Sequence, residues 1–269
     1  MPTADHEPDG QMHHREFEEL YRLEDFYWWF IGRRQFVAQL IRTYLLPTSD
    51  GREPVILDAG CGTGGTMKAL ASLGQIHGAD IAPIALQYSR KRGFHNLTCC
   101  RTEHLAYRDC SVDAVTSCDV LEHIRDDRHA LREIFRVLRP GGILVATLPA
   151  HPFLWSEHDR ALAHVRRYTR REIIAKLQDT GYRIEKLTAA VVLMFPPILA
   201  VRLLQRLRLK STEHPDTDLQ ILPPIMNSTL IRILSFETWC SRWFNWPIGT
   251  SFALVARKPT DSVQTHSST

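Results

Sequence analysis

One short segment of the chain, Val55–Gly65, combines a carboxylate with a cluster of glycines and reads V-I-L-D-A-G-C-G-T-G-G. Its apolar start is typical of a strand that is buried on both faces of a parallel sheet. Asp58 ends that strand, and one tight turn then holds four glycines: Gly60, Gly62, Gly64 and Gly65. Glycines permit positive φ and let a ligand approach bare backbone, while a following helix offers its N-terminal N–H groups to an anion.

A second acid lies at the distance that a nucleotide-binding fold requires. Asp80 follows Gly60 by twenty residues, at the end of the predicted strand Gln75–Asp80. In a doubly wound fold this is the position of the acid that binds a ribose hydroxyl pair. The two features together predict a site for a nucleoside-bearing cofactor. The simpler alternative is a glycine-rich turn without a ligand.

The identity of the cofactor depends on Asp58. Gly60, Gly62 and Gly65 also satisfy G-x-G-x-x-G, so an NAD(P)-dependent Rossmann oxidoreductase passes the bare pattern. However, a carboxylate that points into the turn would repel a pyrophosphate, whereas it could pair with an α-ammonium group. S-adenosyl-L-methionine carries an ammonium group, a carboxylate and a ribose, and it has no phosphate. We therefore expect this cofactor, with the oxidoreductase or a non-catalytic cofactor-binding protein as alternatives.

From this segment the chain resembles the class I S-adenosylmethionine-dependent methyltransferases, whose first motif is similar to L-D-A-G-C-G-T-G. The resemblance runs from about Trp28 to Arg257. It implies that the methionine moiety is held by Asp58, Gly60, Cys61, Gly62 and Gly64, and the ribose by Asp80. It further implies that the adenine is contacted by Ile81, Thr102, Glu103 and His104, and that Asp119 and Val120 also bind the cofactor. Arg101 stands where relatives usually have an aspartate shortly before the adenine contacts.

The segment Cys118–His123 offers ligand-type side chains at the carboxyl end of the predicted fourth strand. It is similar to the E-x-x-E-H segment of ubiquinone-type O-methyltransferases, which has been linked to a divalent metal, and Asp119, Glu122 and His123 match that spacing. Three ligands on one turn rarely face one ion, and hard cations require further oxygen ligands. We therefore expect no metal here. Glu122 is predicted to line the substrate pocket and His123 to be a candidate catalytic residue.

A polar loop after the fifth strand holds the other candidates for acceptor chemistry, in the sequences W-S-E-H-D at Trp155–Asp159 and H-V-R-R-Y at His164–Tyr168. Class I methyltransferases build the acceptor site in this region, above the carboxyl ends of the strands. Methyl transfer is an in-line displacement, and a hydroxyl acceptor benefits from a general base, a role that suits histidine near neutral pH. We expect His158 or His164 to be that base. The substrate pocket is predicted to be lined by Trp155, Arg166, Arg167 and Tyr168.

The same loop also has a purely structural interpretation. Thr169 and Glu172 form a T-x-x-E capping box for the next helix, and Arg166 or Arg167 could serve only to brace the loop. Histidines often have structural roles as well. Base catalysis and loop bracing therefore both remain open from the sequence alone.

The N-terminal segment is predicted to be a helix over Glu16–Phe30 that ends in five consecutive aromatic residues. These residues either pack in the core or form a lid over cofactor and substrate, with aromatic faces near the sulfonium cation. An uncharacterised bacterial group within the methyltransferase family has a similar W-W-F-x-x-R-R segment and a similar H-D…H-x-R-R-Y pattern. This resemblance favours the lid and implies that Trp28 and Trp29 contact the substrate.

The rest of the pattern alternates strands with helices, which predicts an α/β fold with a doubly wound, Rossmann-like sheet. The resemblance implies seven strands, the last of them antiparallel at or near the sheet edge. The strands predicted after Asp80 are Asn96–Arg101, Val112–Cys118, Ile143–Leu148, Tyr182–Thr188 and Ser251–Arg257. The expected organisation is disordered tails over 1–14 and 259–269, a helical lid over 15–46, the S-adenosylmethionine-binding core over 47–190, a helical substrate-side insertion over 191–245 and the last strand over 246–258.

Composition sets the broad class. A chain of 269 residues with 44% hydrophobic content can bury a full core. Its six cysteines show neither metal-ligand spacing nor a disulfide framework, and no secretory leader precedes the domain, which together favour a cytoplasmic location. The formal net charge of +3 is too small to indicate a nucleic-acid partner. We therefore expect a small-molecule substrate.

The predicted insertion indicates the character of the acceptor. The apolar stretch Val191–Leu209 would form one wall of the pocket, opposite Trp28 and Trp29. Two apolar walls and few polar groups favour a largely hydrophobic acceptor with one polar reacting group, and we expect methylation at oxygen. Within 198–210, a basic stripe (Arg202, Arg206 and Lys210) lies beside an apolar one. It predicts either peripheral membrane contact or a cover over the substrate pocket.

Overall fold

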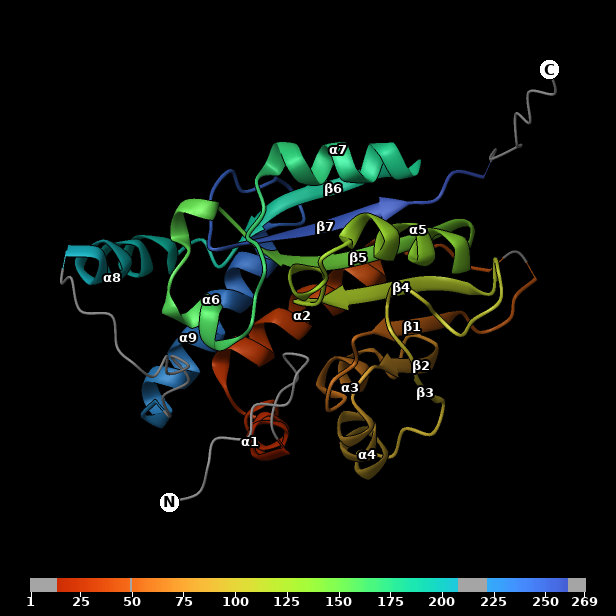
Figure 1. The fold of residues 1–269 in the computed structure, drawn as a ribbon, viewed down its shortest axis with the longest axis horizontal. Helices are drawn as coiled ribbons and strands as arrows, with labels where there is room; N and C mark the ends of the chain where they lie inside the picture. Colours follow the sequence, from red (N-terminus) through yellow and green to blue (C-terminus); the bar gives the residue numbers. More distant parts are fainter. Residues whose placement is uncertain (1–13, 49, 208–221, 261–269) are drawn as a thin grey trace.

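A computed structural model describes residues 14–48, 50–207 and 222–260 of the chain. A seven-stranded sheet forms its centre, with the strand order β3-β2-β1-β4-β5-β7-β6 (Figure 1). The strands are β1 (Val55–Ala59), β2 (Gln75–Asp80), β3 (Leu97–Cys99), β4 (Val112–Cys118), β5 (Leu138–Pro149), β6 (Arg183–Ala190) and β7 (Ser251–Arg257). The five neighbouring strands β3, β2, β1, β4 and β5 pair in parallel, whereas β7 runs antiparallel to both β5 and β6. The predicted doubly wound α/β fold with an antiparallel last strand is confirmed.

Helices cover both faces of the sheet, which explains why the central strands are apolar without alternation. One face packs against α5 (Asp127–Val137) and α7 (Arg170–Thr180), and the other against α2 (Trp28–Tyr44) and α3 (Gly65–Leu70). Neighbouring residues of β5 point to opposite sides, so that Leu144 belongs to the first core and Ile143 to the second. In Figure 1, α7 lies at the top beside β6 and α3 lies lower, near β1 and β2, while α5 and α2 overlap the central strands in this view. Helix α4 (Pro83–Lys91) packs against β2 and β3.

The N-terminal segment differs from the single helix predicted over Glu16–Phe30. The structure has two helices, α1 (His14–Leu23) and α2, separated by a break at residues 24–27. The break arises because Glu24 turns into the protein, where its carboxylate accepts hydrogen bonds from Thr63 Oγ1 and from Arg92 at 3.2 Å. Arg92 also donates to the carbonyl oxygen of Tyr21 at 2.8 Å. These contacts fix the end of α1 to the glycine turn, 39 positions along the chain from Glu24.

Two helices lie between β6 and β7, where a helical insertion was expected: α8 (Phe195–Leu207) and α9 (Pro224–Cys240). Helix α9 packs closely against α2, and a Cβ at Gly32 would overlap the side chain of Leu234, so the contact requires glycine. Of the predicted basic stripe, Arg202 lies on α8, while the side chains of residues 203–210 fall outside the described part. None of the helices within the described ranges is long and apolar enough to cross a bilayer.

Candidate cofactor and acceptor site

The glycine turn joins β1 to α3 at the carboxyl edge of the sheet. Gly60 and Cys61 both donate backbone hydrogen bonds to the carbonyl oxygen of Ala79, at 2.8 and 3.0 Å, which ties the turn to β2. Gly60 has φ +82°, and a Cβ there would collide with the methyl groups of Val120. Gly62 also has positive φ, but the space beside it is open. Gly64, at φ +89°, caps α3. The turn therefore presents bare backbone to open space, as the motif predicts.

Replacing Gly60 by alanine is expected to lower the free energy of unfolding by about 2–4 kcal/mol, because the new methyl group adds left-handed strain and overlaps Val120. Gly62→Ala adds only the backbone strain and should cost about 1–2 kcal/mol. Urea unfolding of both variants measures the difference. An equal loss in the two variants would show that contact with Val120 does not constrain the turn.

Asp58 is buried beside the turn, and only one of its two carboxylate oxygens has a hydrogen-bond partner among the described residues. Thr116 Oγ1 donates to Oδ1 at 2.6 Å, whereas Oδ2 is buried and has no hydrogen-bond partner among the described residues. Burial raises the pKa of Asp58 to about 7, although Thr116 and the charge of Arg33 oppose the shift. A buried carboxylate oxygen without a partner is energetically costly, and a ligand with a positive N–H group would satisfy it.

Asp80 ends β2 as predicted, and two backbone groups hold its carboxylate. Gly62 donates to Oδ2 at 2.8 Å and Ala82 to Oδ1 at 2.9 Å. Burial raises the pKa of Asp80, and these two hydrogen bonds oppose that shift. Each oxygen keeps a further lone pair, so the carboxylate can accept hydrogen bonds from a pair of hydroxyl groups.

The residues predicted around the adenine lie at the carboxyl ends of β2 and β3. Ile81 directly follows β2 and is 41% exposed. Thr102 is buried, and Glu103 forms an ion pair with Arg101 at 3.0 Å. His104 is exposed, with its ring against that of His129. These side chains form the edge of the site nearest β3.

A second polar group lies at the end of β4. Asp119 has φ +55°, a conformation that non-glycine residues rarely adopt outside functional sites, and Thr147 Oγ1 donates to its Oδ1 at 2.9 Å. Arg33 of α2 donates to Oδ2. Burial acts to raise the pKa of Asp119, but the Arg33 guanidinium and the Thr147 hydroxyl outweigh it and hold the pKa below its ordinary value. The pair is therefore ionised at the mouth of the site.

Arg33 was missed as a functional residue, although it lies in the W-W-F-x-x-R-R segment. Together with Asp119 and Thr147 it forms the polar end of a cavity with about 480 Å³ of empty space. Helices α2 and α9 and the ends of β5, β6 and β7 bound this cavity. Its other walls are mostly apolar and are formed by Trp29, Gly32, Phe36, Ala189, Ala190, Val191, Leu234, Glu237, Thr238, Trp246 and Ser251. Trp29 and Val191 thus reach the cavity from the predicted sides, whereas Trp28 packs against Leu23, Tyr27 and Phe30.

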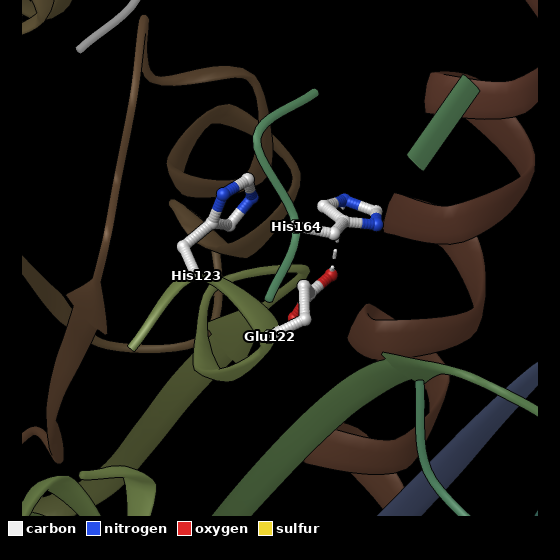
Figure 2. A group of neighbouring side chains, drawn as sticks. All are labelled: Glu122, His123 and His164. Carbon is white, nitrogen blue, oxygen red and sulfur yellow. Dashed lines mark ion pairs between the residues drawn. The ribbon is translucent and has the colours of Figure 1, made fainter. Parts of the chain in front are cut away.

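A group of three side chains lies where η1 (Leu121–His123) meets the segment that carries His164 (Figure 2). Nδ1 of His164 lies 3.0 Å from Oδ1 of Asp159, and Arg167 donates to the same oxygen at 2.7 Å. Burial acts to raise the pKa of Asp159, but these two partners hold it well below its usual range. An ionised carboxylate only accepts hydrogen bonds, so Nδ1 of His164 carries the proton and Nε2 is left as a proton acceptor.

Glu122 is fully buried, and Nε2 of His164 lies 3.9 Å from its Oε1. Burial and the charge of Asp119 raise the pKa of Glu122 well above its ordinary value. Loss of hydration on burial lowers the pKa of His123 to about 4. His123 is therefore a weak base. Glu122 was expected to line the substrate pocket, but its burial places it against His164 instead.

The metal ligands suggested by the sequence spacing are only partly brought together. Glu122, His123 and His164 have ligand atoms within 4.8 Å of one another and could hold a divalent ion. Asp119, which matched the E-x-x-E-H spacing, is instead engaged by Arg33 and Thr147. The positive charge of the Arg33 guanidinium group beside the Asp119 carboxylate would repel a metal cation at that position.

Two residues predicted for the acceptor pocket are structural. Tyr168 is 2% exposed, packs in the core and donates its hydroxyl to Asp127 at 2.8 Å. Arg166 donates to the same carboxylate at 3.1 Å, and Lys176 at 2.5 Å, so Asp127 anchors the loop to α5 and α7. The loop also contains η2 (Pro152–Leu154), the half-buried Trp155 and α6 (Glu157–Ala161), which carries His158. Arg167 braces the loop through the carbonyl oxygen of Ala150 and positions His164 through Asp159.

Comparison with known proteins agrees with the site. Residues 57–146 match a family model described as a methyltransferase domain. The chain is 36% identical over 112 residues to the demethylmenaquinone methyltransferase of Tropheryma whipplei, covering 40% of this chain and 46% of the relative. It is 30% identical over 154 residues to the ubiquinone biosynthesis O-methyltransferase of Xanthomonas oryzae, covering 53% and 64%. The chain spans about half the length of the first curated relatives that it matches.

The fold has counterparts among solved structures. An S-adenosylmethionine-dependent methyltransferase of Thermotoga maritima superimposes with a TM-score of 0.56 at 18% identity, covering 91% of this chain and 97% of that one. The matched residues 57–146 contain Asp58, the glycine turn, Asp80 and Asp119. Residues 57–146 therefore form a methyltransferase domain, and the chain is similar in sequence and in fold to S-adenosylmethionine-dependent methyltransferases.

Proposed function

We propose that the protein transfers the methyl group of S-adenosylmethionine to a hydroxyl oxygen of a small, largely apolar acceptor. The observation that carries the proposal is the unpaired Oδ2 of Asp58, buried beside a glycine turn. It suits the α-ammonium group of the cofactor and would repel the pyrophosphate of a dinucleotide. Asp80 at the end of β2 suits the two ribose hydroxyls, and the residues from Ile81 to His104 supply the edge for the adenine. The residues present therefore fit this cofactor.

When bound, the cofactor supplies a methyl group on a positively charged sulfur. The protein has to align the acceptor with that group, exclude water and remove the proton of the hydroxyl. His164 is the residue proposed to take the proton at Nε2, because Asp159 holds its Nδ1–H and stabilises the imidazolium that results. This arrangement follows the logic of a histidine oriented by a buried carboxylate.

The acceptor class follows from the cavity. Its walls are mostly apolar, and Arg33, Asp119 and Thr147 form a polar end, a combination that is typical of small-molecule sites. An apolar ring or chain would fill the walls, with one polar group directed to that end. The names of two relatives, which act in quinone biosynthesis, support a hydroxylated aromatic acceptor with an apolar substituent.

The proposal is tested by calorimetry and by mass spectrometry of the reaction product. S-adenosylmethionine and S-adenosylhomocysteine should bind, whereas NADH should not. Incubation with a panel of hydroxylated quinols with short apolar tails should add the mass of one methyl group at oxygen. Binding of NADH without binding of S-adenosylhomocysteine would overturn the cofactor assignment. Cofactor binding with no methyl transfer to any hydroxyl in the panel would favour the non-catalytic alternative.

Turnover is expected to persist in the presence of a chelator. The three ligand-type groups would offer an ion two imidazoles and only one carboxyl group, which is a weak set for a hard cation. Activity assays before and after dialysis against EDTA measure this. Loss of activity that magnesium restores would instead assign a metal to Glu122, His123 and His164. Glu122→Gln is the companion variant, since it would abolish a metal-dependent rate but only modestly change a metal-independent one.

A further inference from the structure

The solvent-facing side of α9 is unusual because it is aromatic. Residues spaced by three and four positions along α9 and the turn after it lie on one side of a helix. At these positions stand Ile225, Phe236, Trp239 and Trp243, which are 84%, 55%, 51% and 63% exposed. The rings of Trp239 and Trp243 lie 4.4 Å apart, centre to centre. A helix on the surface of a globular domain normally directs polar side chains to water.

The charges around this face have one sign. Arg232 is exposed at the same helical spacing, and Arg242 is exposed next to Trp243. Over the described residues 191–207 and 222–260, Glu237 is the only acidic side chain, and it is buried. Its carboxylate faces inward, where it accepts hydrogen bonds from the backbone N–H groups of Val192 and Leu193. The face is therefore apolar, aromatic and positively charged, with no exposed carboxylate.

We propose that this face of α9, together with the turn that carries Trp243 and Phe244, lies on the surface of an anionic lipid bilayer. Tryptophan rings favour the boundary between lipid and water, because one part of the ring is apolar and the other forms hydrogen bonds. Arginine side chains at the same depth attract anionic headgroups. A helix that lies in the interface needs both properties on one side, and α9 combines them.

A second copy of the chain is a poorer occupant. A two-fold contact brings the same patch of both copies together. Arg232 and Arg242 would then face positive charge on the partner, and the described part of this face offers no exposed carboxylate to pair with them. An anionic headgroup supplies the missing negative charge.

The opposite side of α9 carries Leu234, Glu237 and Thr238, which line the cavity. A bilayer on the outer side of α9 would thus lie one helix away from the cavity, on the route of an apolar molecule that leaves the membrane. The bilayer contact itself does not rest on the proposed reaction. It can be measured without cofactor or acceptor, so its failure is distinct from a failure of the proposed function.

The test is binding of the full chain to vesicles of phosphatidylcholine with and without about 30% phosphatidylglycerol. We expect the protein to sediment with the anionic vesicles and its tryptophan emission to shift to shorter wavelength. The double variant Trp239→Gln with Trp243→Gln should reduce the partition coefficient about tenfold or more. Arg232→Glu should reduce it about tenfold on anionic vesicles only. Leu46→Gln and Arg132→Glu make the same kinds of change at exposed positions outside α9 and should leave binding unchanged.

Unchanged affinity for S-adenosylhomocysteine and an unchanged circular dichroism spectrum show that the variants remain folded. Absence of binding to anionic vesicles would overturn the proposal, as would binding that the double tryptophan variant retains. A dimer in sedimentation velocity that the double tryptophan variant abolishes, without vesicle binding by the original chain, would assign the face to self-association instead.

Discussion

Replacing Asp58 by asparagine is expected to weaken the binding of S-adenosylmethionine at pH 8 by about 100-fold or more. The variant keeps the size of the side chain and can still accept the hydrogen bond of Thr116, but it removes the buried negative charge that would pair with the ammonium group. Loss of one member of a desolvated ion pair costs about 3–5 kcal/mol. Calorimetry at pH 8 measures the change. Asp109→Asn, at an exposed position, is the control and should bind normally.

The same variant is expected to be more stable than the original protein, in a way that depends on pH. Asp58 has a folded-state pKa of about 7, above its ordinary value of 3.8, so the folded state binds a proton that the unfolded state has released. This contribution to stability is complete below about pH 4 and declines by about 1.4 kcal/mol per pH unit as the pH rises to 7. Asparagine does not titrate, so the free energy of unfolding of the variant does not include this decline with pH.

Urea unfolding at pH 5 and pH 8 should therefore show the variant gaining about 2–3 kcal/mol relative to the original protein over that interval. A difference in stability that does not change with pH would show that Asp58 is not the buried acid described above. Cofactor affinity that is unaffected by the substitution would remove the main support for the proposed binding mode.

Replacing His164 by glutamine is expected to lower kcat of the proposed hydroxyl methylation by about 10²–10⁴-fold, the usual contribution of a positioned general base. Affinity for S-adenosylhomocysteine should not change, since His164 is not among the residues proposed to bind the cofactor. Asp159→Asn should also lower kcat, because a neutral amide neither fixes the tautomer of His164 nor stabilises its charged form. Saturating both substrates separates these effects from changes in KM.

His158→Gln is the matched control. This residue lies on α6 in the same loop and was an equal candidate from the sequence, but the buried carboxylate of Asp159 holds Nδ1 of His164 and leaves Nε2 of that ring as the acceptor. We therefore expect His158→Gln to retain most of the activity. The opposite ranking of the two variants would assign the base to His158 and leave His164 with a structural role.

The parts of the site that could be predicted are those whose residues lie close together along the chain. The strand, the glycine turn and Asp58 form one continuous segment, and Asp80 lies at a fixed distance set by one strand–helix unit. The alternation of strands and helices along the chain also follows from the pattern of apolar and helical segments. These features depend on local periodicity and on backbone requirements such as the positive φ of Gly60.

What could not be predicted depends on contacts between distant segments. Arg33 contacts Asp119, which lies 86 positions further along the chain, and Glu24 contacts Thr63, which lies 39 positions further along it. No spacing rule connects such pairs. The break after α1 follows from the contact between Glu24 and Thr63. It was therefore missed because these two residues are far apart along the chain. Tyr168 was predicted to line the acceptor pocket because it carries a polar hydroxyl group. In the structure this hydroxyl is buried in the core, where it donates a hydrogen bond to Asp127.

The position of β7 in the sheet has a consequence for the synthesis of the protein. β5 ends at Pro149 and β6 at Ala190, yet the two are joined only through β7, which begins at Ser251. A nascent chain on the ribosome therefore carries two strands with open hydrogen-bonding edges until its last strand has emerged. Such edges are templates for pairing between chains. Both edges are covered only when β7 has emerged, so early termination before Ser251 would leave both open and yield an aggregation-prone product.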